Sequence, residues 1–193
     1  MTVVTPEDEA LTFGPATLRD GTVVQIEPMH RTDAPRLESF HHTLSPETTR
    51  LRFFHLHPHL SEKEVERFTH VDHEDREALV AVHDGEIIAV ARFDRMDDRS
   101  EAEVAFVVAD AWQGRGLGSL LLRRLALRAV EVGVRRFVAD ALFGNRRMLA
   151  VFRHSGLPYV ETLEGGVVHV VLDVLPADEP VADQPAPESS SSV

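Results

Sequence analysis

The feature that most constrains the fold is a strand-like segment that leads into a cluster of glycines. Residues 101–108 read Glu-Ala-Glu-Val-Ala-Phe-Val-Val, and Gly114, Gly116 and Gly118 follow just before a long stretch of helical periodicity. Glycines let backbone N–H groups approach a ligand closely, and a helix N-terminus carries about half a positive charge. This order therefore predicts a strand, an anion-binding loop and a helix.

Hydrophobic periodicity along the rest of the chain predicts an α/β (α+β) fold. The short turns Asp20-Gly21 and Asp84-Gly85 make their flanking strands antiparallel, whereas a helix between strands 101–108 and 136–141 requires a parallel crossover. We expect a mixed, mostly antiparallel sheet of about seven strands with helices on both faces. The helices are expected over residues 32–42, 46–54, 114–132 and 145–154, and after the capping box of Ser61 and Glu64.

Composition predicts one domain with two tails. Residues 1–14 are expected to be a flexible segment, residues 15–175 the folded domain, and residues 176–193, rich in Pro, Ser and acidic residues, a disordered tail. No apolar run approaches the roughly 20 residues that span a bilayer, and the first residues do not resemble a signal peptide. A cytoplasmic protein without a membrane partner is expected.

The composition also excludes several functions. The absence of cysteine excludes disulfides, thiolate nucleophiles and cysteine-ligated zinc. A formal net charge of -12 argues against binding to nucleic acid, which draws its affinity from clustered Lys and Arg. A cationic partner such as an amine fits this charge better.

Two common phosphate-binding motifs match the glycine cluster poorly. A P-loop requires Lys before its Ser or Thr, and Gly118-Ser119 lacks that lysine. A dinucleotide fingerprint finds Ser119 at its third glycine position, although Asp140 lies at a suitable distance beyond it. The antiparallel strands expected before the loop also disfavour that motif.

A third motif fits the cluster better. The run Gln113-Gly-Arg-Gly-Leu-Gly118 is similar to the signature with which the GNAT superfamily of N-acetyltransferases holds the pyrophosphate of acetyl-CoA, and the segment from Asn145 to Leu157 resembles its Asn-led helix. The resemblance covers residues 17–174 and implies a GNAT fold with acetyl-CoA as co-substrate. The cofactor-binding residues that it implies are Val107, Val108, Gln113, Gly114, Arg115, Gly116, Leu117, Gly118, Ser119, Asn145, Met148 and Phe152.

The resemblance also suggests a general base. An amine must lose its proton before it attacks a thioester, so a base or a water path is needed. Strand alternation places Glu101, Glu103 and Ala105 on one face of the strand. In protein-acetylating members the base is a glutamate on the fourth strand, which implies Glu103 as the catalytic residue, with Glu101 second. The structural alternative is that Glu103 faces solvent and pairs with Arg92.

The general acid of the family has no counterpart here. Some members protonate the leaving thiolate with a tyrosine seven residues after the asparagine, a position that Phe152 occupies, and Tyr159 is the single tyrosine of the chain. Either the thiolate leaves without a protein acid, or water supplies the proton. A backbone N–H near residues 107–109, where the family commonly carries a bulge, is expected to polarise the thioester carbonyl.

The histidines do not predict a metal site. His55, His57 and His59 alternate, but their spacing is no recognised ligand motif, so no metal is expected. His55 and His59 are instead candidates for the mouth of the acceptor site.

The acceptor is suggested only by residues 45–54. This segment resembles the corresponding part of bacterial Pat-type protein lysine acetyltransferases, which modify a lysine of acyl-CoA synthetases. It implies a protein lysine as acceptor and a monomer or homodimer. The alternative is a packed helix with Arg50 and Arg52 solvated. A small-molecule amine N-acetyltransferase and a non-catalytic acyl-CoA-binding sensor remain open as other functions.

Overall fold

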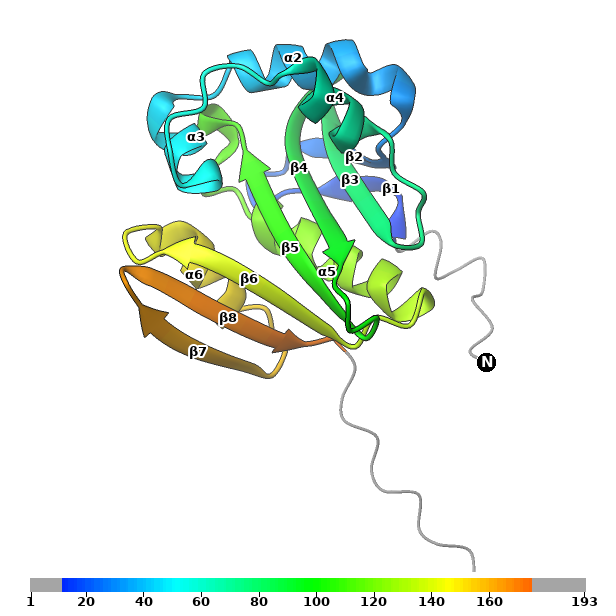
Figure 1. Cartoon of the computed structure of the whole chain (residues 1–193). Helices are drawn as coiled ribbons and strands as arrows, with labels where there is room; N and C mark the ends of the chain where they lie inside the picture. Colours follow the sequence, from blue (N-terminus) through cyan, green and yellow to red (C-terminus); the bar gives the residue numbers. More distant parts are fainter. Residues whose placement is uncertain (1–11, 175–193) are drawn as a thin grey trace, which may run out of the picture.

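A computed structural model describes residues 12–174 of the chain (Figure 1). Most of the segment 1–14 and all of the tail 176–193 lie outside the described residues, so the domain boundaries stay predictions. The strands are β1 (Gly14–Thr17), β2 (Val23–Pro28), β3 (Arg76–His83), β4 (Glu86–Arg95), β5 (Glu101–Val108), β6 (Arg136–Leu142), β7 (Tyr159–Glu164) and β8 (Val167–Asp173). The helices are α2 (Ala34–His42), α3 (Pro46–Phe53), α4 (Glu62–Thr69), α5 (Leu117–Glu131) and α6 (Arg146–Arg153), with short 3-10 turns at Arg31–Asp33 and Asp110–Trp112.

The strands form one mixed sheet in the order β1-β2-β3-β4-β5-β6-β8-β7. Only β5 and β6 pair in parallel within this sheet, and α5 connects them. The predicted α+β fold with a mostly antiparallel sheet is therefore confirmed, with eight strands where about seven were expected.

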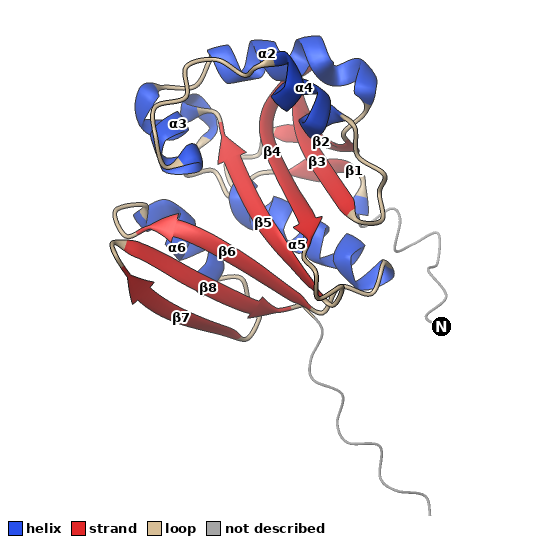
Figure 2. Ribbon diagram, in the orientation of Figure 1, coloured by secondary structure: helices blue, strands red, loops and turns tan. Residues whose placement is uncertain are grey.

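Helices cover both faces of the sheet, as predicted (Figure 2). On one face, α5 and α6 bury Leu121, Leu125 and Phe152 against the strands in the larger apolar core. On the other face, α2 buries Leu37 and Phe40 against β3 and β4 in a second core. Burial of both faces fixes the strand register, because a shift by one residue would exchange the two sets of side chains.

Capping residues set the helix boundaries. Ser45 accepts a hydrogen bond from the Thr48 N–H and Pro46 opens α3, while Ser61 and Glu64 form the predicted capping box of α4. The long helix α5 begins at Leu117 rather than at Gly114, because the glycines before it have positive φ angles that a helix does not allow.

Candidate functional site

The two parallel strands separate after a short pairing. Residues Glu101–Glu103 of β5 pair with Arg136–Val138 of β6, and beyond that point the strands diverge, as Figure 1 shows. The Met96 N–H bonds to the Glu101 carbonyl and the Ala109 N–H to the Ile88 carbonyl, so odd-numbered β5 residues use their backbone groups toward β4. The even-numbered residues beyond Glu103 therefore turn their N–H and C=O groups toward the gap.

A cleft occupies this gap and encloses about 430 Å³ of empty space, its open mouth included. Its walls come from β5, β6, α3 and α6, so segments far apart in sequence meet here. The lining residues are Leu51, Arg52, Phe54, Glu103, Val104, Ala105, Phe106, Asp140, Asn145, Met148 and Phe152. Four residues that the sequence singled out, Glu103, Asn145, Met148 and Phe152, are therefore brought together.

The glycine loop follows the end of β5 at which the cleft is wide. None of its residues lines the cleft, but a Cβ atom on Gly118 would lie 3.9 Å from Cε of the cleft residue Met148. Gly114 and Gly116 have φ angles of 78° and 95°, which strain any residue with a Cβ atom. Gly116 is the N-cap of α5, and no acceptor within residues 12–174 receives the N–H groups of Gly116, Leu117 and Gly118. Free N–H groups at a helix N-terminus can bind an anion, so the geometry is compatible with the anion-binding loop, whose binding role stays a prediction.

The other residues of this motif have different roles. A Cβ atom on Gly118 would lie 3.0 Å from Cγ2 of Val151, so this glycine allows α5 and α6 to pack closely. Leu117 is buried in the core. Arg115 lies 3.1 Å from a carboxylate oxygen of Asp20 and stacks over the Trp112 ring. The Arg115 guanidinium therefore pairs with the turn between β1 and β2.

Asp110 holds the start of α3 against the glycine loop, a role that the sequence analysis missed. Its carboxylate accepts hydrogen bonds from the Ser45 N–H at 2.9 Å, the Ser45 hydroxyl at 2.7 Å and the Thr48 hydroxyl at 2.8 Å. Burial alone would raise the pKa of Asp110, but these hydrogen bonds lower it below its ordinary value. A sequence separation of more than sixty residues left no local signal for this contact.

Gln113 extends the same network. Its side-chain amide donates to the Val108 carbonyl at 3.0 Å and to the Thr48 hydroxyl at 3.1 Å, while Arg147 of α6 donates to its oxygen. The side chain thus ties β5, α3 and α6 together at the wide end of the cleft. The network rigidifies the loop from which the N–H groups of α5 project.

Glu103 is exposed at the narrow end of the cleft, the last β5 residue paired with β6. Within residues 12–174 it makes no hydrogen bond or ion pair. Glu103 thus faces solvent, as the structural alternative had it, but Arg92 bonds to Asp94 at 3.0 and 3.1 Å, so the pair with Arg92 in that alternative is absent. Glu101, the second candidate, bonds to Arg136 at 2.8 Å. Of the two glutamates, Glu103 has the carboxylate that is available to a ligand.

Arg52 lies beside this glutamate and is half-buried, so the alternative interpretation, in which it is solvated, is only partly right. Burial lowers its pKa to about 10, with a further lowering by Arg92 and an opposing effect of Glu103. No described residue forms a hydrogen bond or ion pair with its guanidinium, which stacks over the Phe53 ring at 4.9 Å. Arg50, in contrast, is exposed and pairs with Glu47 at 2.9 Å.

The start of α6 forms the opposite wall of the cleft. Asn145 is the N-cap of this helix, and its side-chain oxygen accepts the Met148 N–H at 3.2 Å. Phe152 packs edge-on against Phe106 at 6.1 Å and is 1% exposed, so it contributes an apolar wall and no proton. Tyr159 lies on β7 and is not among the cleft residues.

The backbone near residues 107–109 differs from the expectation. The pairing of β4 with β5 runs without interruption from Arg95 and Ala102 to Ala89 and Val108, so the predicted bulge is absent. The Val108 carbonyl already accepts from Gln113. Val107 points away from the cleft and lines a second hollow.

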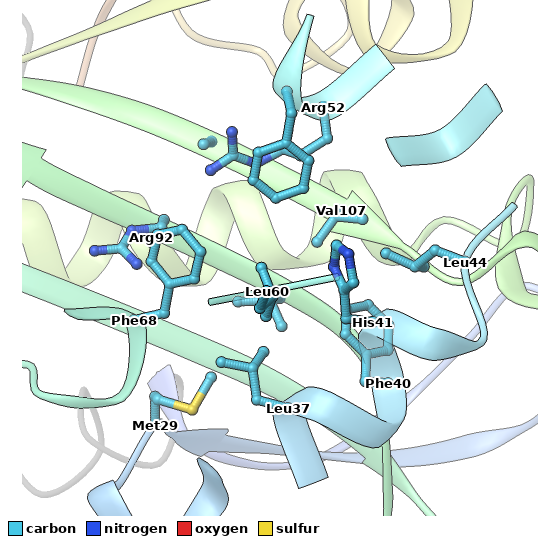
Figure 3. Close-up of a pocket in the computed structure, with 13 residues that line it drawn as sticks. Met29, Leu37, Phe40, His41, Leu44, Arg52, Leu60, Phe68, Arg92 and Val107 are labelled. Carbon is cyan, nitrogen blue, oxygen red and sulfur yellow. The ribbon is translucent and has the colours of Figure 1, made fainter. Parts of the chain in front are cut away.

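This second hollow, which we call the side pocket, lies between β4, β5 and the helices α2 to α4 (Figure 3). It encloses about 460 Å³ of empty space, its mouth included. The lining residues are Met29, Leu37, Phe40, His41, Leu44, Arg52, Phe53, Leu60, Phe68, Val90, Arg92, Ala105 and Val107. Arg52 and Ala105 border both the side pocket and the cleft.

The histidines near α3 form a ring cluster. His55 and His57 lie edge to face at 5.3 Å, and His41 contacts the His57 carbonyl through Nε2 at 2.7 Å. Burial lowers the pKa of His41. Neither His55 nor His59 lines the cleft or the side pocket. Residues 12–174 contain no group of three or more side chains arranged to hold a metal ion, and none of their helices has the length and apolarity to span a bilayer.

Comparisons with known proteins agree with this geometry. The profile of the acetyltransferase (GNAT) family matches residues 37–157. Acetyltransferase Pat of Mycolicibacterium smegmatis is 43% identical over 95 residues, which are 49% of this chain and 28% of that protein. Acetyltransferase PA5475 of Pseudomonas aeruginosa is 32% identical over 136 residues, 68% of this chain and 73% of that protein.

A solved structure is also similar. The GNAT domain of S. lividans PAT superposes with a TM-score of 0.80 at 42% identity, covering 85% of this chain and 98% of that one. The likeness thus extends over nearly the whole of that domain, whereas the chain matches less than a third of the length of the Mycolicibacterium protein.

Proposed function

Because the chain belongs to the GNAT acetyltransferase family, we propose that it transfers an acetyl group from acetyl-CoA to a lysine of an acceptor protein, with Glu103 as general base. One observation carries this proposal. The free backbone N–H groups of a helix N-terminus lie next to the wide end of one cleft, and that cleft has an unpaired carboxylate at its narrow end.

The wide end suits the anionic part of coenzyme A. The N–H groups of Gly116, Leu117 and Gly118 would hold the diphosphate, since they lack acceptors among the described residues and carry the partial charge of α5. The backbone edge of β5 that faces the gap would accompany the pantetheine arm toward Glu103. Asn145 and Met148 would contact that arm from α6.

The narrow end suits the reaction of an amine. Glu103 takes a proton from the lysine ammonium, the neutral nitrogen forms a bond to the thioester carbon, the carbon–sulfur bond breaks, and the nitrogen gives its second proton to water. A backbone N–H of β5 stabilises the oxyanion. Phe152 has no proton to give, so water protonates the thiolate. Asp140 borders the cleft across from Glu103, and this second carboxylate attracts a cationic acceptor.

The preference for a protein acceptor rests on similarity. Two of the relatives carry the name Pat, and α3, which supplies Leu51, Arg52 and Phe54 to the cleft, belongs to the segment that resembles Pat-type enzymes. A lysine of an acyl-CoA synthetase is the first acceptor to test.

The test uses acetyl-CoA with a labelled acetyl group, incubated with the protein and a purified acyl-CoA synthetase. Label on a synthetase lysine, located by mass spectrometry, is the expected result, and excess unlabelled coenzyme A should suppress it. Thiol release with small amines but no labelled protein would assign a small-molecule acceptor. Tight coenzyme A binding without turnover on any acceptor would assign a non-catalytic sensor.

A further inference from the structure

The side pocket has no role in the proposed acetyl transfer. Ten of its thirteen lining residues are apolar, and the exceptions are His41, Arg52 and Arg92. Figure 3 shows Leu37, Leu60 and Phe68 around its interior, with Arg52 at one end. The lining is mostly apolar although the pocket is open to solvent, so a small apolar group could enter it.

The side pocket adjoins the reacting end of the cleft. Ala105 and Arg52 line both spaces, and Ala105 is two residues beyond Glu103 on the same face of β5. A group attached to the thioester carbon near Glu103 therefore reaches the side pocket by passing Ala105. The Ala105 side chain is a single methyl group, so it obstructs this path less than a larger side chain would.

The opposite face of the sheet has no comparable space. Val104 and Phe106 point toward α5 and α6, and together with Phe152 they are almost completely buried in the larger core. Outside the cleft itself, the side pocket is therefore the apolar space that an acyl chain longer than acetyl can reach from Glu103.

The charges of the side pocket exclude the acceptor amine as its occupant. Two guanidinium groups border it and no carboxylate does, so an ammonium group would be both desolvated and repelled there. An uncharged aliphatic chain meets neither penalty and gains from the apolar lining.

We propose that the side pocket binds the aliphatic chain of acyl-CoA donors longer than acetyl-CoA. The inference rests on the proposed function, because it assumes a thioester in the cleft. The transfer step is unchanged: the amine nitrogen bonds to the acyl carbon, the carbon–sulfur bond breaks, and the thiolate takes a proton from water. No further reactant is needed.

The test compares donors by calorimetry on the full chain, which requires no acceptor. Each buried methylene tightens binding by about fourfold. Hexanoyl-CoA has four methylenes more than acetyl-CoA, so we expect it to bind at least about tenfold more tightly even with incomplete burial. Succinyl-CoA provides the contrast, because its carboxylate would lose water among the apolar side chains and could gain affinity only from the guanidinium groups at the border of the pocket.

Two leucine substitutions in one loop provide a matched pair. Leu60→Trp places a larger side chain in the side pocket, and it should abolish the advantage of hexanoyl-CoA while the affinity for acetyl-CoA stays the same. Leu56→Trp makes the same change at an exposed position outside the pocket and should keep the advantage. Thermal unfolding of both variants checks that they are folded.

The outcomes separate this inference from the proposed function. If acetyl-CoA and hexanoyl-CoA bind equally well, or if succinyl-CoA alone gains affinity, the inference is overturned. The proposed binding of coenzyme A in the cleft is then unaffected. If the advantage of hexanoyl-CoA survives Leu60→Trp, the chain lies elsewhere and the inference is also overturned. If coenzyme A itself does not bind, both proposals are refuted.

Discussion

The glycine loop and the surroundings of Glu103 lie at opposite ends of one cleft and are built differently. The loop offers backbone N–H groups, whose directions are fixed by the φ angles of Gly114 and Gly116 and by the start of α5. The surroundings of Glu103 are side chains, contributed by β5, α3 and the residues that pack on them. Every residue except proline has a backbone N–H group. The function of the loop therefore limits the sequence mainly at the positions where glycine is required. Each group near Glu103 depends on one particular side chain.

The sharpest test of this contrast is Glu103→Gln, because one side chain should carry the proton transfer. We expect kcat to fall by about 10²–10⁴-fold, the usual contribution of a general base. The affinity for coenzyme A, measured by calorimetry, should not change, because the diphosphate site lies at the other end of the cleft. Glu101→Gln is the control, since that glutamate already pairs with Arg136. A comparable loss of kcat in both variants would contradict the assignment of Glu103.

Gly116→Ala tests the end of the cleft at which backbone N–H groups of the glycine loop would bind the diphosphate. At a φ of 95° the new Cβ atom costs about 1–2 kcal/mol, and relief of this strain would turn the N–H groups away from the diphosphate. Loss of one charge-assisted hydrogen bond, worth about 1.5–3 kcal/mol, weakens coenzyme A binding about tenfold to hundredfold.

Gly133→Ala is the matched control for strain. Gly133 has a φ of 82° with no atom within 4 Å of an added Cβ, and it lies at the far end of α5. Both variants should lose similar stability in denaturant titration, and only Gly116→Ala should lose affinity. Equal affinity in the two would show that the loop does not hold the coenzyme.

The same contrast explains how much the sequence could predict. The strands, the parallel crossover and the capping box of α4 follow from local periodicity and turn residues, and the structure confirms them. The conformation of Gly114 and Gly116 was predictable because only glycine adopts it readily. Gly118 shows the limit, since its close approach to Val151 depends on how two helices pack.

Side-chain contacts across the fold were harder to predict. The structural alternative paired Arg92 with Glu103, but Arg92 bonds to Asp94, two residues along its own strand. Arg52 was described as solvated in one interpretation, because the exposed α3 sequence does not reveal that the helix end covers a pocket. Asp110 was missed because its partners, Ser45 and Thr48, come from a distant segment. These contacts depend on tertiary packing, which local patterns do not contain.

Asp110 connects the glycine loop with the start of α3. We therefore expect Asp110→Asn to lower both the affinity for coenzyme A and the stability of the fold moderately. The amide cannot accept from all three donors on Ser45 and Thr48, and the loss of a hydrogen bond that is partly open to water costs about 0.5–1.5 kcal/mol of unfolding free energy. We expect a loss of coenzyme A affinity below about tenfold, because the loop keeps its glycines. Asp20→Asn removes an exposed pair with Arg115 and is the control, with a stability change of at most about 1 kcal/mol. An unchanged stability in Asp110→Asn would show that the network is not structural.

The smallest expected effect is a pH dependence of the free energy of unfolding. It arises among the side chains around Glu103 and the side pocket. Burial, opposed by the contact with the His57 carbonyl, lowers the pKa of His41 from its ordinary value near 6.5. As the pH falls below about 6.5, the unfolded chain binds a proton that the folded protein resists, so the free energy of unfolding decreases.

His41→Gln keeps a donor for that carbonyl but cannot titrate, and its unfolding free energy, from urea titrations, should fall less steeply between about pH 7 and pH 5. Between about pH 7 and pH 8 the two curves should run parallel, because His41 is neutral in both states. If the unfolding free energies of the two proteins also ran parallel over the acidic range, His41 would protonate as easily in the fold as in water. Its ring would then not be buried between α2 and the side pocket.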